Sequence, residues 1–220
     1  MQQNLSTTEP PALAIPTIWG IGRNYAQHAR ELGNMIPSEP IVFLKSAGCI
    51  CRPGNPLRLP THLGTLHHEV ELAIQVGHRG EIVAAALALD LTARDLQEEL
   101  KKNGLPWTRA KSFLNSCPLG ELIPVRQVGE IEGLTLTLQV NGEIRQRGSL
   151  KDLIFPLPTL VNYLRQNFPL RPGDLILTGT PPGVGPIYPG DHLVALAEGW
   201  SRAEWFVHPT APDNSLEITD

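Results

Sequence analysis

Two acidic residues, Glu69 and Glu71, stand two positions apart in the run His67-His68-Glu69-Val70-Glu71-Leu72. Apolar residues alternate with them, as in a β-strand, so both carboxylates should project to the same side. Neighbouring carboxylates repel each other, and their burial is costly unless a cation neutralises them. A divalent metal ion would serve. The same alternation is also typical of an ordinary half-exposed strand, which is the commoner explanation for this run alone.

A second group of polar residues surrounds the start of a predicted helix. Asp90 lies just before the run Thr92-Ala93-Arg94-Asp95, which has the form of a capping box. The helix is expected to extend to about Lys102. Arg94 and Gln97 are three positions apart and therefore share one helix face, within two turns of Asp90. Both are placed to contact a ligand bound beside that carboxylate.

An imidazole and a carboxylate recur three positions apart in an earlier predicted helix, at His28 and Glu31. A carboxylate beside an imidazole orients the ring and raises its basicity, which suits a general base. A solvated helix pair is the commoner explanation. Lys111 has small and apolar neighbours, so it is a candidate for a partly buried ammonium held against an anion, although surface lysines are the rule.

Two other chemistries receive little support from the sequence. Cys49 and Cys51 with His67 and His68 match no usual zinc spacing. The glycine-rich run at 179–185 lacks the Lys-Ser/Thr ending of a P-loop, so a turn over a substrate pocket is the better interpretation.

The elements that must position these residues are mainly short strands. Strands are expected at 18–21, 41–45, 57–60, 67–76, 134–140, 143–148, 174–178, 192–197 and 203–207, and helices at 25–32, 92–102 and 156–167. The Asn141-Gly142 pair predicts a hairpin turn. Together with 20 Gly and 21 Pro, this pattern predicts a β-rich α+β fold with elaborate loops.

Bulk properties narrow the class of protein. A length of 220 residues fits one domain at 17–207, with a loose lead-in at 1–16 and a polar tail at 208–220. The net charge of −4 without a Lys/Arg cluster argues against nucleic acid as a partner. No apolar run approaches a membrane span, and no signal peptide is evident. Three cysteines without CxxC spacing favour a reducing, cytoplasmic location.

At this point the chain resembles the fumarylacetoacetate hydrolase superfamily, most closely its small single-domain acylpyruvases, oxaloacetate decarboxylases and related tautomerases. The matching runs are spread in the family's order over residues 18 to 207. They are Gly22-Arg23-Asn24-Tyr25-Ala26-Gln27-His28, Phe43-Leu44-Lys45, His67 to Leu72, Leu89 to Gln97, Gly104-Leu105-Pro106-Trp107, Ala110-Lys111-Ser112-Phe113, Leu177-Thr178-Gly179-Thr180-Pro181 and Gly183-Val184-Gly185.

The resemblance implies a mixed β-roll with a few flanking helices, commonly assembled as a homodimer. Glu69, Glu71 and Asp90 match the three metal carboxylates of the family. Three hard oxygen donors favour Mg²⁺ or Mn²⁺ over zinc.

The resemblance also implies roles for other residues. His28 with Glu31 matches the dyad that activates water, and Lys111 would stabilise an enolate. Four residues match positions that hold the substrate: Arg94, Gln97, Lys111 and Thr180. Arg23, in the first matching run, is a further candidate for substrate binding.

One segment departs from the family pattern. Only 18 residues separate Glu71 from Asp90, whereas relatives carry roughly a dozen more, which exceeds ordinary loop variation. Residues 77–86 must therefore bridge the gap by a shortened route. Altered packing around Asp90 is expected, together with loss of the wall or dimer contact that the missing segment would supply.

The activity that the resemblance implies is metal-dependent cleavage of a short β-keto acid through a pyruvate enolate. Oxaloacetate decarboxylation and acylpyruvate hydrolysis are the two forms of this reaction. A keto–enol tautomerase or isomerase of a related dicarboxylate is the first alternative. A cation-dependent binding module without turnover is the second.

Overall fold

A mixed six-stranded sheet lies at the centre of the computed structural model, which describes residues 16–31 and 35–209. Its strands follow the order β10-β7-β6-β13-β1-β2. Their bounds are β1 (Ile18–Gly22), β2 (Ile41–Lys45), β6 (Val70–Val76), β7 (Ile82–Leu89), β10 (Ile123–Pro124) and β13 (Leu175–Leu177). Only β1 and β13 pair in parallel within this sheet. Most of the predicted lead-in and tail lies outside the described residues.

A second sheet of five strands has the order β12-β11-β15-β16-β4, and two small sheets accompany it. The bounds in the second sheet are β4 (Leu57–Arg58), β11 (Thr135–Val140), β12 (Glu143–Ser149), β15 (His192–Ala197) and β16 (Ser201–His208). The small sheets contain β5 (Leu66–His68), β8 (Thr92–Ala93) and β14 (Gly185–Pro186), and β3 (Ile50–Cys51) with β9 (Cys117–Pro118).

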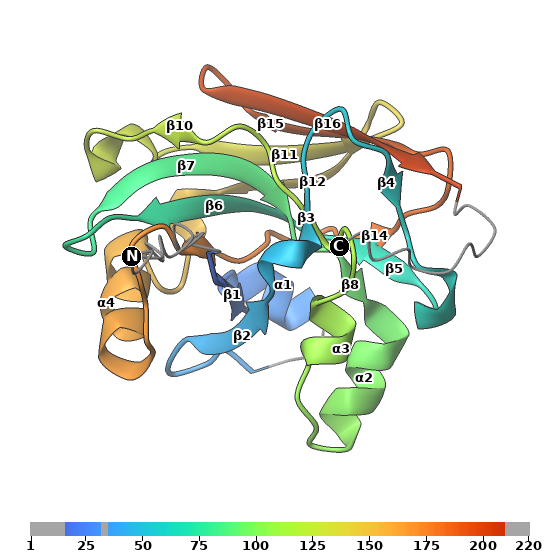
Figure 1. Ribbon diagram of the computed structural model, residues 1–220, viewed down its shortest axis with the longest axis horizontal. Helices are drawn as coiled ribbons and strands as arrows, with labels where there is room; N and C mark the ends of the chain where they lie inside the picture. The colour runs from blue at the N-terminus through green and yellow to red at the C-terminus, as the bar shows by residue number, and fades with distance from the viewer. Residues whose placement is uncertain (1–15, 32–34, 210–220) are drawn as a thin grey trace, which may run out of the picture.

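Side-chain size differs between the two faces of the β6–β7 pair. Leu72, Ile74 and Leu87 belong to the main core together with residues of the five-stranded sheet. Ala73 and Ala86, which point the other way, belong to a smaller cluster. The helices α1 (Ala26–Glu31), α2 (Arg94–Lys102), α3 (Thr108–Lys111) and α4 (Leu157–Asn167) lie in the lower half of the view, away from the five-stranded sheet (Figure 1).

The predicted β-rich α+β class is confirmed, and several local predictions agree with the structure. Asn141 and Gly142 have φ of 54° and 84°, as both central residues of a tight hairpin turn require. The helix predicted at 156–167 is α4, which carries a proline in its first turn.

The predicted capping box at the start of α2 is wrong. The cap position is Ala93, and no side chain caps the helix. The Thr92 hydroxyl instead donates to the carbonyl of Asp90 at 3.1 Å, and the Asp95 carboxylate accepts the N–H of Thr65 at 3.3 Å. The Thr92 hydroxyl also accepts a hydrogen bond from Lys111, so other contacts use both groups that would have formed the cap.

The short segment between Glu71 and Asp90 is a direct β-hairpin. β6 pairs with β7 from Val70↔Leu89 to Val76↔Ile82. Residues 77–81 form the turn, where the N–H of Gly77 donates to the carbonyl of Glu81 at 2.7 Å. Asp90 is only 1 % exposed at the end of this hairpin. A tight turn therefore provides the shortened route.

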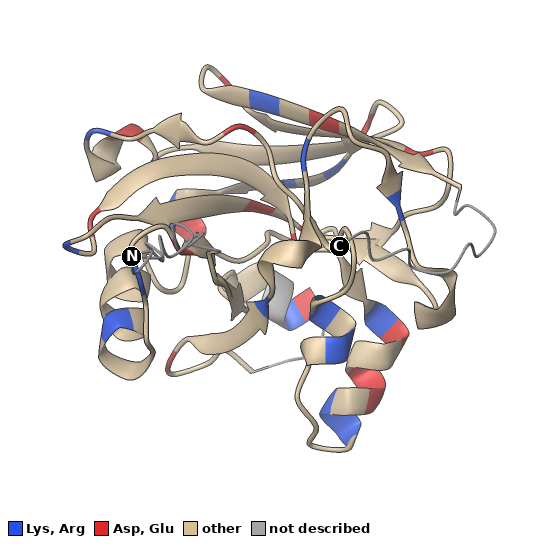
Figure 2. Ribbon diagram, in the orientation of Figure 1, with Lys and Arg blue, Asp and Glu red and all other residues tan. Residues whose placement is uncertain are grey.

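Basic and acidic residues are interspersed on α2, whereas α3 carries basic residues only (Figure 2). β7, by contrast, carries no charged residue. In the described ranges, none of the helices has the length and apolar composition that crossing a membrane requires.

Candidate active site

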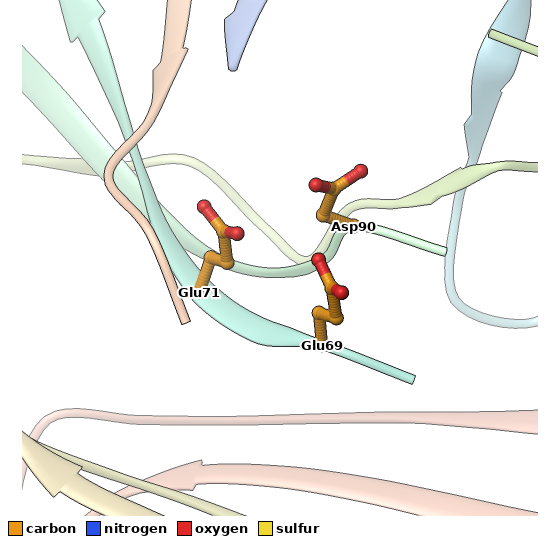
Figure 3. A group of neighbouring side chains, drawn as sticks. All are labelled: Glu69, Glu71 and Asp90. Carbon is orange, nitrogen blue, oxygen red and sulfur yellow. The ribbon is translucent and has the colours of Figure 1, made fainter. Parts of the chain in front are cut away.

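Three buried carboxylates meet at one end of the β6–β7 hairpin. Glu69 lies between β5 and β6, Glu71 lies in β6, and Asp90 directly follows β7. The N–H of Asp90 donates to the carbonyl of Glu69 at 2.8 Å. One oxygen of each carboxylate lies within 4.8 Å of the others, and Figure 3 shows all three projecting into the same space. Within residues 16–31 and 35–209, no other group of three His, Cys, Asp or Glu side chains is spaced to hold a metal ion.

Cations from other segments offset two of these negative charges. Lys45 Nζ lies 2.8 Å from Asp90 Oδ1. Lys111 Nζ lies 2.8 Å from Glu69 Oε2 and 2.5 Å from Asp90 Oδ2, and the Arg94 guanidinium also pairs with Glu69. All of these side chains are buried, so their attraction is weakly screened by solvent.

Glu71 is in a different position, because it pairs with no cation among the described residues. Its Oε2 accepts the N–H of Gly179 at 2.6 Å. Burial raises the pKa of Glu71 well above its usual value, and the neighbouring Asp90 and Glu69 raise it further. Burial would lower the pKa of Lys111, but the same two neighbours outweigh burial and raise it. A further positive charge in this cluster would favour ionised Glu71.

Lys45 was not among the predicted site residues. It ends β2 and is 1 % exposed, and its ammonium donates to the carbonyls of Ser116 at 2.8 Å and Leu91 at 3.2 Å. It also donates to the carbonyl of Lys111. A lysine that closes an otherwise apolar strand was the available sequence signal.

Arg94 and Gln97 lie on one face of α2, as their spacing predicted. Arg94 Nη1 donates to Gln97 Oε1 at 2.8 Å, and both residues are buried. Arg94 Nε also lies 3.4 Å from His67 Nδ1. Burial, together with the charge of Arg94, lowers the pKa of His67 to about 4, so this imidazole is neutral near pH 7.

Thr180 is held by Gln146, which the sequence analysis did not single out. Gln146 Nε2 donates to Thr180 Oγ1 at 2.8 Å, and the Thr180 hydroxyl donates to the carbonyl of Val70 at 2.9 Å. Gln146 Oε1 accepts the N–H of Val70 at 2.9 Å. It also lies 2.9 Å from His68 Nδ1, so this nitrogen must carry the proton. Gln146 therefore connects the loop at Thr180 and Pro181 to β6, which carries Glu71.

The predicted dyad is only partly described. His28 belongs to α1, but its side chain lies outside the described residues. The Glu31 carboxylate accepts the N–H of Gly183, at 3.1 and 3.2 Å to its two oxygens. In the 179–185 run, Gly179 and Gly183 thus direct their N–H groups to protein carboxylates, which disfavours a phosphate cradle.

One small cavity of about 30 Å³ is lined by the three carboxylates, Glu69, Glu71 and Asp90, together with Arg94, Gln97, Lys111, Thr180, Phe43 and Trp107. Arg23 lines it too, with a buried Nε that has no hydrogen-bond partner among the described residues. Five basic side chains line the cavity or pair with its carboxylates: Arg23, Lys45, Arg94, Lys101 and Lys111. They outnumber the three carboxylates, so the site has a surplus of positive charge and suits an anionic ligand.

The fold agrees with comparisons to known proteins. The family model described as fumarylacetoacetate (FAA) hydrolase C-terminal matches residues 17–207. The chain therefore belongs to the fumarylacetoacetate hydrolase family, which confirms the resemblance.

Comparisons with individual proteins show which members of the family this chain is similar to. The chain is 44 % identical to mouse oxaloacetate tautomerase FAHD1, mitochondrial, over 82 % of this chain and 89 % of the relative. It is 43 % identical to Escherichia coli oxaloacetate tautomerase YcgM, over 82 % and 88 %. A solved structure of fumarylpyruvate hydrolase from Pseudomonas aeruginosa, in complex with Mn²⁺ and pyruvate, is similar with a TM-score of 0.82. That match has 35 % identity and covers 90 % of this chain and 91 % of the other.

Proposed function

We propose that this protein uses a divalent metal ion to enolise short 2-keto acids, with keto–enol tautomerisation of oxaloacetate as its main reaction. One observation carries the proposal: three buried carboxylates, one of which forms no ion pair within the described ranges, share a cavity with a surplus of basic side chains. The family resemblance alone favours carbon–carbon cleavage as the main reaction. Relatives named oxaloacetate tautomerase support the opposite order.

The residues present fit a divalent ion. Glu69, Glu71 and Asp90 offer hard oxygen donors, as Mg²⁺ and Mn²⁺ prefer, and Glu71 is the donor left without a positive partner. These three residues would hold the ion, which would supply Lewis-acid stabilisation of the enolate oxygen. The Mn²⁺ in the Pseudomonas aeruginosa structure supports this assignment.

The chain's own groups would provide binding and proton transfer. Arg23, Arg94 and Gln97 would hold the substrate carboxylates, which suits a dicarboxylate such as oxaloacetate. The Lys111 ammonium would stabilise the negative enolate oxygen. Burial, with Arg23 and Arg94 nearby, lowers the pKa of Lys101 to about 8, so its amine is a candidate to move the proton at C3 of the substrate.

A metal-supplemented assay tests the proposal. We expect protein stripped with a chelator to lose tautomerisation of oxaloacetate, and Mg²⁺ or Mn²⁺ to restore it. NMR separates the reactions, because tautomerisation conserves the carbon skeleton whereas cleavage releases pyruvate. Full activity without added metal would contradict metal dependence. Metal binding without turnover of oxaloacetate or acetylpyruvate would indicate a binding module instead.

Acylpyruvate hydrolysis is the second candidate, supported by the relative named fumarylpyruvate hydrolase. It requires an activated water, for which His28 and Glu31 are the proposed residues. Replacing His28 by alanine is expected to reduce acetylpyruvate hydrolysis at least about a hundredfold while oxaloacetate turnover partly persists. Parallel assays of both substrates check this, and an equal loss of both activities would contradict the divided role.

Two other proposals are carried forward from the sequence: a homodimer and a cytoplasmic location. Gel filtration of the purified protein tests the first, and imaging of the tagged chain in its host tests the second.

A further inference from the structure

An apolar groove of about 520 Å³ lies beside the polar cavity. Two of the chain's four Trp residues and two of its five Phe residues line it, namely Trp19, Trp107, Phe43 and Phe168. Leu44 and Leu105 also line it and remain 46 % and 50 % exposed. The strand β2 contributes Ile41 to Leu44 to the groove and lies between α4 and the α2–α3 pair (Figure 1). Such a concentration of aromatic surface favours an apolar ligand.

Phe43 and Trp107 line both the groove and the polar cavity, so the two hollows are neighbours that share these rings. Their ring centroids are 6.2 Å apart. Lys111 Nζ lies 4.8 Å from the Phe43 centroid, and Lys101 Nζ lies 5.0 Å from that of Trp107. The same two rings therefore contact cations of the polar cavity and form part of the apolar wall.

Two glycines of β1 make room for these rings. A Cβ on Gly20 would lie 2.2 Å from the ring of Phe43, and a Cβ on Gly22 would lie 3.3 Å from that of Trp107. Gly20 and Gly22 are two positions apart and face the same side of the strand. The two rings can therefore pack against β1 only because these positions have no side chain.

We propose that this groove binds the aromatic or other apolar acyl group of a 2,4-dioxo acid, while the 2-keto acid end is held at the carboxylate cluster. The inference rests on the proposed function and adds a substrate class to the same site. The polar cavity is lined mainly by charged and polar side chains, whereas the groove is lined mainly by apolar ones. A charged tail would lose its hydration against the aromatic wall, whereas an apolar tail would gain from burial.

Substrates that differ only in the tail test the proposal. With metal-loaded protein, we expect kcat/KM for benzoylpyruvate to exceed that for acetylpyruvate by about tenfold. Leu105→Asp places a charge in the groove without altering a residue of the polar cavity. It should lower kcat/KM for benzoylpyruvate about tenfold and leave acetylpyruvate and oxaloacetate within about twofold.

Leu114→Asp is the matched control, because Leu114 is 63 % exposed and lines neither cavity. It should change none of the three activities. No preference for benzoylpyruvate, or an equal loss on all substrates with Leu105→Asp, would overturn the proposal. A change of oligomeric state in gel filtration accompanying that equal loss would assign the groove to an interface between copies.

Calorimetric titration with benzoylpyruvate separates this inference from the proposed function. If the wild-type protein turns over neither oxaloacetate nor acetylpyruvate, the proposed function fails. Binding of benzoylpyruvate that Leu105→Asp weakens and Leu114→Asp does not would still support the groove. Binding unchanged by Leu105→Asp, or absent, would overturn it.

Discussion

Replacing Glu71 by glutamine is expected to lower kcat/KM for oxaloacetate about a thousandfold and to leave the metal-free protein at least as stable as the wild type. The substitution removes one ligand charge but keeps an oxygen that can accept the N–H of Gly179. It also removes the buried carboxylate whose ionisation its neighbours oppose. Activity and stability should therefore change in different directions.

Calorimetric Mn²⁺ titration and thermal unfolding, with chelator and with Mn²⁺, measure the two effects. The stabilisation by Mn²⁺ should be lost in Glu71→Gln. Asp90→Asn should instead destabilise the metal-free protein, because it removes the partner of Lys45 and Lys111. Glu132→Gln, at an exposed position, is the control. Retained Mn²⁺ stabilisation in Glu71→Gln would refute the three-carboxylate site.

Gln146→Leu is expected to reduce the free energy of unfolding by about 3 kcal/mol. Leucine fills similar space but leaves the N–H of Val70 and the carbonyl of Pro181 without their partner. Val70 and Pro181 are both buried, and Gln146 is only 1 % exposed. Thr180 also loses the donor that orients its hydroxyl. We therefore expect kcat/KM for oxaloacetate to fall at least about tenfold, because the loop and the carboxylate strand are no longer held in register.

Urea unfolding gives the stability change, and assays at saturating metal give the kinetic one. Gln127→Leu is the matched control, since Gln127 is exposed and caps no helix with its side chain. Activity of Gln146→Leu equal to wild type at full folding would remove the positioning role and leave Gln146 a purely structural residue.

The sequence alone predicted what depends on local pattern. Alternation placed Glu69 and Glu71 on one side of a strand, and the i, i+3 spacing placed Arg94 beside Gln97. The Asn141-Gly142 pair located a hairpin because few other residues tolerate two successive positive φ values. Each of these predictions depends only on residues that are close together in the sequence.

Contacts between distant segments were not predictable in this way. Gln146 bonds to Val70, which is 76 positions away in the sequence. The strand β12 that contains Gln146 is otherwise mostly exposed, like many outer strands of hairpins. Lys45 faces Asp90 only after β2 joins the sheet edge. The capping-box prediction failed for the same reason, because Lys111 donates to the Thr92 hydroxyl at 2.6 Å. The groove requires four separate segments to converge before it exists.

The direct hairpin between Glu71 and Asp90 also affects how the chain folds. A turn confined to residues 77–81 costs little loop-closure entropy, so this hairpin can close before distant segments arrive. Closure gathers three acids, while Lys45 and Lys111 lie outside the hairpin. Until β2 and α3 dock, protons, the nearby Arg94 or a divalent ion must offset the repulsion. A divalent ion that binds the three carboxylates would offset the same repulsion in the finished fold and so stabilise it.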